Sequence, residues 1–190
     1  MLFNLPNILS LSRILLVPLL VAVLLTKFEG KEFVGLAVFL LASLTDFLDG
    51  YIARRQKKVT RLGMLLDPAA DKILTSAAFI SLVELGIAPA WMVVVIIARE
   101  FAVSALRSVA ASQQLVLGAI GSAKVKTVLQ VVAIAVLIIY EKLGSLEKLA
   151  EWTLWVAMVA SLVSGFEYFV RYGPALFGRG SIQPDSDVSS

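Results

Sequence analysis

The sequence predicts an all-α membrane protein that crosses the bilayer six times. Of the 190 residues, 59% are hydrophobic, and the mean hydropathy is +0.89, whereas a soluble domain is about half apolar. The excess lies in long apolar runs, and about 20 apolar residues cross the hydrocarbon core as a helix. The alternation of apolar and polar residues that marks a half-buried strand is absent from the sequence. With no cysteine and no histidine, the chain has no disulfide framework, no thiolate nucleophile and no histidine base.

Turn-forming residues divide the chain into six candidate spans. Pro6 opens the first span, and Gly30, Gly86 and Gly144 separate later ones. The predicted spans are residues 7–27, 32–55, 67–86, 89–111, 123–141 and 150–172. We expect residues 1–175 to form one six-helix membrane domain and the polar residues 176–190 to form a disordered tail.

Basic residues are distributed unevenly around the spans, and this distribution predicts the orientation. The loop after the second span carries Arg54, Arg55, Lys57, Lys58 and Arg61. The cations on the same predicted side, near later spans, are Lys124, Lys126, Arg171 and Arg179. Loops rich in Lys and Arg stay in the cytoplasm, so both termini are predicted to face the cytoplasm. Trp91 and Trp152 begin spans at the opposite interface, as in an aromatic belt.

Four aspartates interrupt the apolar sequence at regular spacing. They are Asp46, Asp49, Asp67 and Asp71. An ionised carboxylate at membrane depth is costly and needs a partner, and clusters of oxygen ligands suit hard divalent cations. The segment therefore predicts a metal site with room for one or two ions.

The residues around the first aspartate pair favour a bound phosphate compound. At ~100° per residue, Asp46, Asp49, Gly50, Ala53 and Arg54 share one helix face. Gly50 and Ala53 keep that face low, and Arg54 offers a fork of donors suited to phosphate. Such a site suits displacement at phosphorus, with metal ions neutralising a pyrophosphate and a carboxylate taking a proton.

The second aspartate pair is expected to open the third helix. Asp67 reads as an N-cap and Pro68 as the first helical residue. Residues 63–66 are then expected to form a loop that folds back and brings the two pairs together.

Further cations are expected near the same site. Arg107, Lys124 and Lys126 are predicted to hold a phosphate of a second substrate, with Arg99 as a secondary member. Arg99 lies in an apolar run and needs a partner, but Glu100 beside it is expected to point elsewhere. The alternatives are a structural ion pair for the arginines and interfacial anchoring for the lysines. Asn4, Asn7 and Arg13 in or before the first span are left without an assigned role.

The aspartate segment resembles the signature of the CDP-alcohol phosphatidyltransferase family. That signature reads D-x-x-D-G-x-x-A-R, eight residues, then G-x-x-x-D-x-x-x-D. The chain matches every fixed position, at Asp46, Asp49, Gly50, Ala53, Arg54, Gly63, Asp67 and Asp71. Residues 4–13, 66–72, 98–100 and 124–130 further resemble the branch that makes phosphatidylglycerophosphate. Ala123 departs from that branch, which often has glycine there.

The resemblance implies a six-helix bundle, a homodimer and a defined reaction. Such enzymes use Mg²⁺ or Mn²⁺, here with two ions expected, to transfer a phosphatidyl group from CDP-diacylglycerol to glycerol 3-phosphate, releasing CMP. By position, the implied metal ligands are Asp46, Asp49, Asp67 and Asp71, and Asp71 is also the implied general base. The residues implied to bind the CDP moiety are Asp49, Gly50, Ala53 and Arg54. The implied location is a bacterial-type cytoplasmic (inner) membrane, with lipids around the protein, a site facing the cytoplasm and no nucleic-acid partner.

Other functions fit parts of the same pattern. Within the family, the acceptor can instead be phosphatidylglycerol, serine or inositol phosphate. From another class, a divalent-cation transporter would place ionisable groups or broken helices at mid-membrane, whereas these aspartates are predicted at one interface. The structural alternative is an interfacial acidic cluster paired with nearby lysines.

Overall fold

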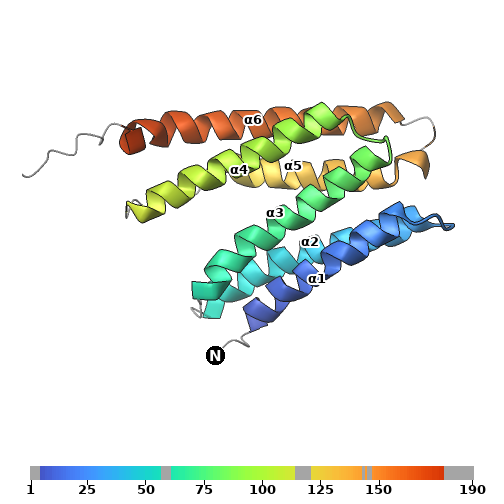
Figure 1. The fold of residues 1–190 in the computed structure, drawn as a ribbon, viewed down its shortest axis with the longest axis horizontal. Helices are drawn as coiled ribbons and strands as arrows, with labels where there is room; N and C mark the ends of the chain where they lie inside the picture. Colours follow the sequence, from blue (N-terminus) through green and yellow to red (C-terminus); the bar gives the residue numbers. More distant parts are fainter. Residues whose placement is uncertain (1–4, 57–60, 114–120, 143, 145–146, 178–190) are drawn as a thin grey trace, which may run out of the picture.

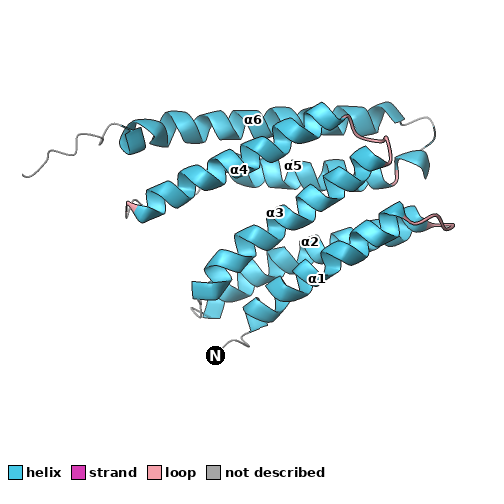
Figure 2. Cartoon of the chain, viewed as in Figure 1, coloured by secondary structure: helices cyan, strands magenta, loops and turns pink. Residues whose placement is uncertain are grey.

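The chain folds as a bundle of six long α-helices. The computed structural model describes residues 5–56, 61–113, 121–142, 144 and 147–177. The helices are α1 (Leu5–Leu25), α2 (Lys31–Gln56), α3 (Arg61–Glu84), α4 (Ala90–Ser112), α5 (Gly121–Ile138) and α6 (Glu147–Phe177), with a 3-10 turn η1 (Tyr140–Lys142) before α6. Within those described ranges there is no strand (Figure 2), which confirms the predicted all-α class.

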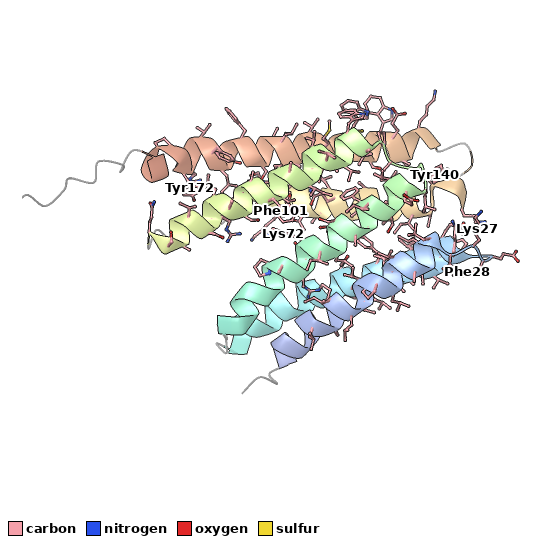
Figure 3. All side chains as sticks on the ribbon, viewed as in Figure 1. Lys27, Phe28, Lys72, Phe101, Tyr140 and Tyr172 are labelled. Atoms are coloured by element: carbon pink, nitrogen blue, oxygen red, sulfur yellow. The ribbon has the colours of Figure 1, made fainter. Side chains whose placement is uncertain are left out.

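Successive helices run in opposite directions along the bundle (Figure 1). Helix α1 packs mainly against α2 and α3, and α6 packs mainly against α4 and α5, while α2 and α3 also contact α5. The last turn of α2, the first of α3, the last of α4 and the first of α5 lie at the same end of the bundle, which we call the signature end because it carries the aspartate segment. In Figure 3, Lys27, Phe28 and Tyr140 lie at the opposite end.

One hydrophobic core joins all six helices. Each helix contributes at least one side chain that is almost inaccessible to solvent, namely Leu20, Phe39, Leu82, Ile96, Ile134 and Leu154. All six come from the half of their helix that lies farther from the signature end. Close packing therefore holds that far half together, while polar groups collect toward the signature end.

Large apolar side chains also cover the outside of the bundle. Leu15, Val94 and Phe166 are 67%, 63% and 73% exposed, and an apolar surface of this kind indicates a lipid environment or a partner. Two stretches of the described chain are long and apolar enough to cross a bilayer, Gly121–Ile138 in α5 and Lys148–Pro174 in α6. The predicted crossing of the bilayer by all six helices stays a prediction.

The predicted start of the third helix at Asp67 is wrong. Helix α3 begins at Arg61, so Gly63 and Asp67 lie within its first turns and Pro68 lies inside it. Leu, Met and Arg are good helix formers, and they extend the helix upstream of the aspartate. Pro68 removes one backbone donor, but the helix continues on both sides of it. Only residues 57–60, which lie outside the described part, separate α2 from α3.

Three of the predicted breaks fall at glycines in left-handed backbone. Gly30, Gly86 and Gly144 have φ of 81°, 73° and 54°, a conformation that costs glycine little because it has no Cβ. At the second break, the Gly86 amide donates to the Val83 carbonyl at 2.9 Å and closes α3. The turn then leads through Pro89 into α4.

Candidate active site

The predicted metal and nucleotide residues lie on the adjoining ends of α2 and α3. The last turns of α2 carry Asp46, Asp49, Gly50, Ala53 and Arg54, and the first turns of α3 carry Gly63, Asp67 and Asp71. The two helices contact each other, so the backbone brings these segments to one end of the bundle (Figure 1). Of the eight positions, the described side chains include only that of Asp71. The convergence of four carboxylates thus stays a prediction.

Asp71 lines a polar cavity between four helices. Its side chain is half-buried, and Thr75 Oγ1 donates to its backbone carbonyl at 3.0 Å. The cavity has a volume of about 160 Å³, which is enough for several water molecules. Its charged lining residues are Asp71, Lys72, Arg99, Glu100, Arg107 and Lys126. The carboxylate predicted to act as the base therefore shares a cavity with four cations.

Three of the four predicted phosphate-binding cations lie at this cavity. Arg99 and Arg107 reach it from α4, and Lys126 reaches it from α5. Lys124 is exposed and is not among the lining residues, because residues two apart on a helix do not face the same way. The negative charge of Asp71 acts electrostatically on Lys126, which links the aspartate segment to the cation group.

Glu100 connects these cations, so the expectation that it points elsewhere is wrong. Its Oε1 accepts hydrogen bonds from Arg99 Nη1 at 2.8 Å and from Gln130 Nε2 at 3.2 Å. The same oxygen forms an ion pair with Lys126 Nζ. Neighbouring residues start ~100° apart on a helix, but the long arginine side chain reaches the carboxylate from the side. The two α4 residues and the two α5 residues thus form one buried ionic group.

Helix α6 contacts this ionic group through Arg99. Arg99 Nη2 donates to Ser164 Oγ at 2.8 Å, and Arg99 crosses α6 at Gly165. A Cβ on Gly165 would lie 2.9 Å from Arg99 Cγ, so a glycine is needed for this close approach. One turn of α5 away from Lys126, Ser122 Oγ donates to Glu167 Oε2 at 2.5 Å.

Sequence reasoning missed Lys72, Glu100 and the α6 residues. The signal for Lys72 was its place one residue after Asp71, and the signal for α6 was the polar S-G-F-E segment (164–167) in an apolar run. Figure 3 shows Lys72 of α3 in the middle of the bundle and Tyr172 of α6 toward its signature end. Arg13, which was left without an assigned role, is completely buried in α1.

Comparison with known proteins identifies the family of this chain. The family model for CDP-alcohol phosphatidyltransferase matches residues 3–163, a range that includes both the aspartate segment and the cavity cations of α4 and α5. The chain belongs to the CDP-alcohol phosphatidyltransferase family. The match covers the cavity residues of α3, α4 and α5 and ends within α6, before the lining residue Tyr168.

The names of similar family members point to glycerol 3-phosphate as acceptor or to phosphatidylglycerophosphate as product. The chain is 43% identical to the CDP-diacylglycerol--glycerol-3-phosphate 3-phosphatidyltransferase of Bacillus subtilis over 188 residues, which cover 92% of this chain and 97% of that protein. It is 37% identical to the protein of the same name from Rickettsia bellii, over 87% of this chain and 93% of the relative. It is 36% identical to the probable phosphatidylglycerophosphate synthase of Mycobacterium tuberculosis, over 88% of this chain and 81% of the relative.

Proposed function

We propose that this family member transfers a phosphatidyl group from CDP-diacylglycerol to glycerol 3-phosphate, yielding phosphatidylglycerophosphate and CMP. The observation that carries the proposal is the cavity in which Asp71 lies together with Arg107 and Lys126. A phosphorylated alcohol needs cations for its phosphate and a base for its hydroxyl, and this cavity offers both. The names of the relatives point to the same acceptor.

In the proposed reaction, the acceptor hydroxyl attacks the β-phosphorus of CDP-diacylglycerol in line. The Asp71 carboxylate takes the hydroxyl proton as the new phosphorus–oxygen bond forms. The bond between the β-phosphorus and the bridging oxygen breaks, and CMP leaves with the electron pair. Direct transfer needs no covalent enzyme intermediate, in keeping with a chain that has neither cysteine nor histidine.

The aspartates would hold divalent cations during this reaction. The all-oxygen donor set of Asp46, Asp49, Asp67 and Asp71 fits Mg²⁺ or Mn²⁺, and the half-buried position of Asp71 beside a polar cavity agrees with that role. When bound, two such ions would neutralise the charge of the diphosphate. Gly50, Ala53 and Arg54, on the same α2 face as Asp49, would bind the CDP moiety.

The acceptor phosphate would lie between α4 and α5. Arg107 is exposed at the cavity and free of the tight ionic group around Glu100, so it can turn toward an incoming anion. Lys126 offers a second charge from the opposite wall. In this proposal Arg99 and Lys124 do not contact the acceptor phosphate directly. Arg99 is hydrogen-bonded to Glu100 and Ser164, and Lys124 does not line the cavity.

We also propose a homodimer in a bacterial-type cytoplasmic membrane, with six spans, both termini inside and the signature end facing the cytoplasm. The alternating helix directions put the first residues of α1 and the last of α6 at the signature end, where α2 ends with the basic residues Arg54 and Arg55 (Figure 1). At the other end, Trp91 and Trp155 pack edge to face with their ring centroids 5.5 Å apart. An aromatic pair at that level suits a membrane interface.

The test is an acceptor panel with purified protein. CDP-diacylglycerol and Mg²⁺ are incubated with glycerol 3-phosphate, serine, inositol phosphate or phosphatidylglycerol, and CMP release is measured for each. We expect release with glycerol 3-phosphate and at most background release with the others. Faster release with another acceptor would overturn the assignment of the acceptor, and metal flux into liposomes without CMP release would favour a transporter.

A further inference from the structure

The ionic group around Glu100 includes a negative charge that phosphate binding does not need. A carboxylate in a cavity that binds an anion weakens the field of the cations, so its presence requires a reason. Glu100 is largely buried, with its side chain 16% exposed, and Lys126 is 9% exposed. Burying such a charge is costly unless it is paired and hydrogen-bonded, and Glu100 meets that condition through Arg99, Lys126 and Gln130.

The geometry points to Glu100 as a positioning residue for the acceptor site, an inference that rests on the proposed function. Its Oε1 fixes the ammonium of Lys126 at the cavity wall, and Arg99 fixes Glu100 in turn. Lysine side chains are flexible, with a large rotamer entropy, so an unheld Lys126 would bind an anion less tightly. Glu100 acts through Lys126 and does not itself touch the acceptor.

Helix α6 sets the position of this group through Arg99. The guanidinium donates to Ser164 Oγ at 2.8 Å, and the side chain fits against the bare backbone of Gly165. A methyl group at Gly165 would be 3.0 Å from Arg99 Nε, too close for an undisturbed contact. The chain of contacts therefore runs from α6 through Arg99 and Glu100 to Lys126.

The main experiment compares Glu100→Gln with wild type in steady-state kinetics. We expect the KM for glycerol 3-phosphate to rise at least tenfold and the KM for CDP-diacylglycerol to change less than twofold. Glu100→Asp, which keeps the charge, should recover part of the loss. The matched control is Glu84→Gln, because Glu84 is exposed at the end of α3 away from the cavity. Equal changes in both KM values, or none, would overturn the inference.

A double-mutant cycle tests whether Glu100 acts through Lys126. In a Lys126→Met background, Glu100→Gln should change the KM for glycerol 3-phosphate less than twofold further. If the two substitutions instead raise the KM for glycerol 3-phosphate by independent factors that multiply in the double variant, the inference is overturned. Should Glu100→Gln not yield folded protein, Gly165→Ala replaces it, with Gly121→Ala as control because a Cβ there meets nothing within 4 Å. A rise in the acceptor KM is again expected for Gly165→Ala alone, and an unchanged KM overturns the proposal.

Binding of glycerol 3-phosphate measured by calorimetry separates this inference from the proposed function. If glycerol 3-phosphate binds to the wild type and binds at least tenfold more weakly to Glu100→Gln, the positioning role is supported. If the wild type in addition releases no CMP, only the proposed reaction fails. Wild-type turnover with equal binding by both proteins overturns the positioning role alone. Absence of wild-type binding overturns both.

Discussion

Asp71 belongs to the aspartate segment and also lines the proposed acceptor cavity, so its carboxylate is the most direct single-residue test of the proposed mechanism. Asp71→Asn keeps the size of the side chain but removes the proton acceptor. A general base contributes about 10²- to 10⁴-fold to rate, and we expect kcat for CMP release to fall by that factor while binding of CDP-diacylglycerol is largely kept. Glu84→Gln serves as control. A variant that retains more than a tenth of wild-type kcat would remove Asp71 from the role of base.

Arg107 provides the residue-scale test of the acceptor site. A hydrogen bond to a charged group contributes ~1.5–3 kcal/mol, so Arg107→Ala should raise the KM for glycerol 3-phosphate about 10- to 100-fold. The KM for CDP-diacylglycerol should change little. Arg171→Ala is a matched control, since Arg171 is exposed on α6 and lies over the Tyr172 ring. Parallel increases in both KM values would contradict the assignment.

Individual residues were predictable where chemistry alone restricts them. Asp71 and Lys126 stand out because charges are expensive in an apolar chain. The partners of those charges were harder to identify, since Glu100 contacts Lys126 and Gln130 of α5, more than 20 residues later, and Arg99 contacts Ser164 of α6. Gly165 carries no chemical signal of its own, and its role depends entirely on the arginine that crosses it.

At the scale of the element, the turn between α3 and α4 depends on the left-handed backbone of Gly86. An alanine there is strained by ~1–2 kcal/mol, so Gly86→Ala should lower the midpoint of thermal unfolding in detergent by several degrees. Tryptophan fluorescence during heating measures that midpoint. Gly121→Ala is the control, because Gly121 lies in α5 with nothing near its missing Cβ. Equal midpoints for both variants would show that the turn tolerates a side chain.

The number of helices was predictable from the sequence, and the start of α3 was not. The described residues form six α-helices where six were predicted, because segments rich in apolar residues alternate with Gly- and Pro-containing turns. The start of α3 was missed because Asp67-Pro68 is typical of a helix start, and local propensity upstream of it prevailed. The same extension makes the α2–α3 connection shorter than predicted, which favours close approach of the two aspartate pairs.

At the scale of the whole molecule, the proposed orientation can be tested by cysteine labelling. The chain has no cysteine, so a single introduced one reports its own location. Ser112→Cys at the end of α4 and Lys148→Cys at the start of α6 both replace exposed residues. With a membrane-impermeant maleimide on intact cells, we expect labelling at position 148 at once and at position 112 only after permeabilisation. The reverse pattern would invert the orientation.

The division of the bundle into two halves has a consequence for how such proteins diverge. The aspartates lie on α2 and α3, whereas the cavity cations other than Lys72 come from α4 and α5, backed by α6. Under the proposed roles, substitutions in the second half of the chain would alter the choice of alcohol while the aspartates on α2 and α3 stay unchanged. A lineage built on this plan would then acquire a new lipid headgroup through a few substitutions and keep its reaction chemistry at each step.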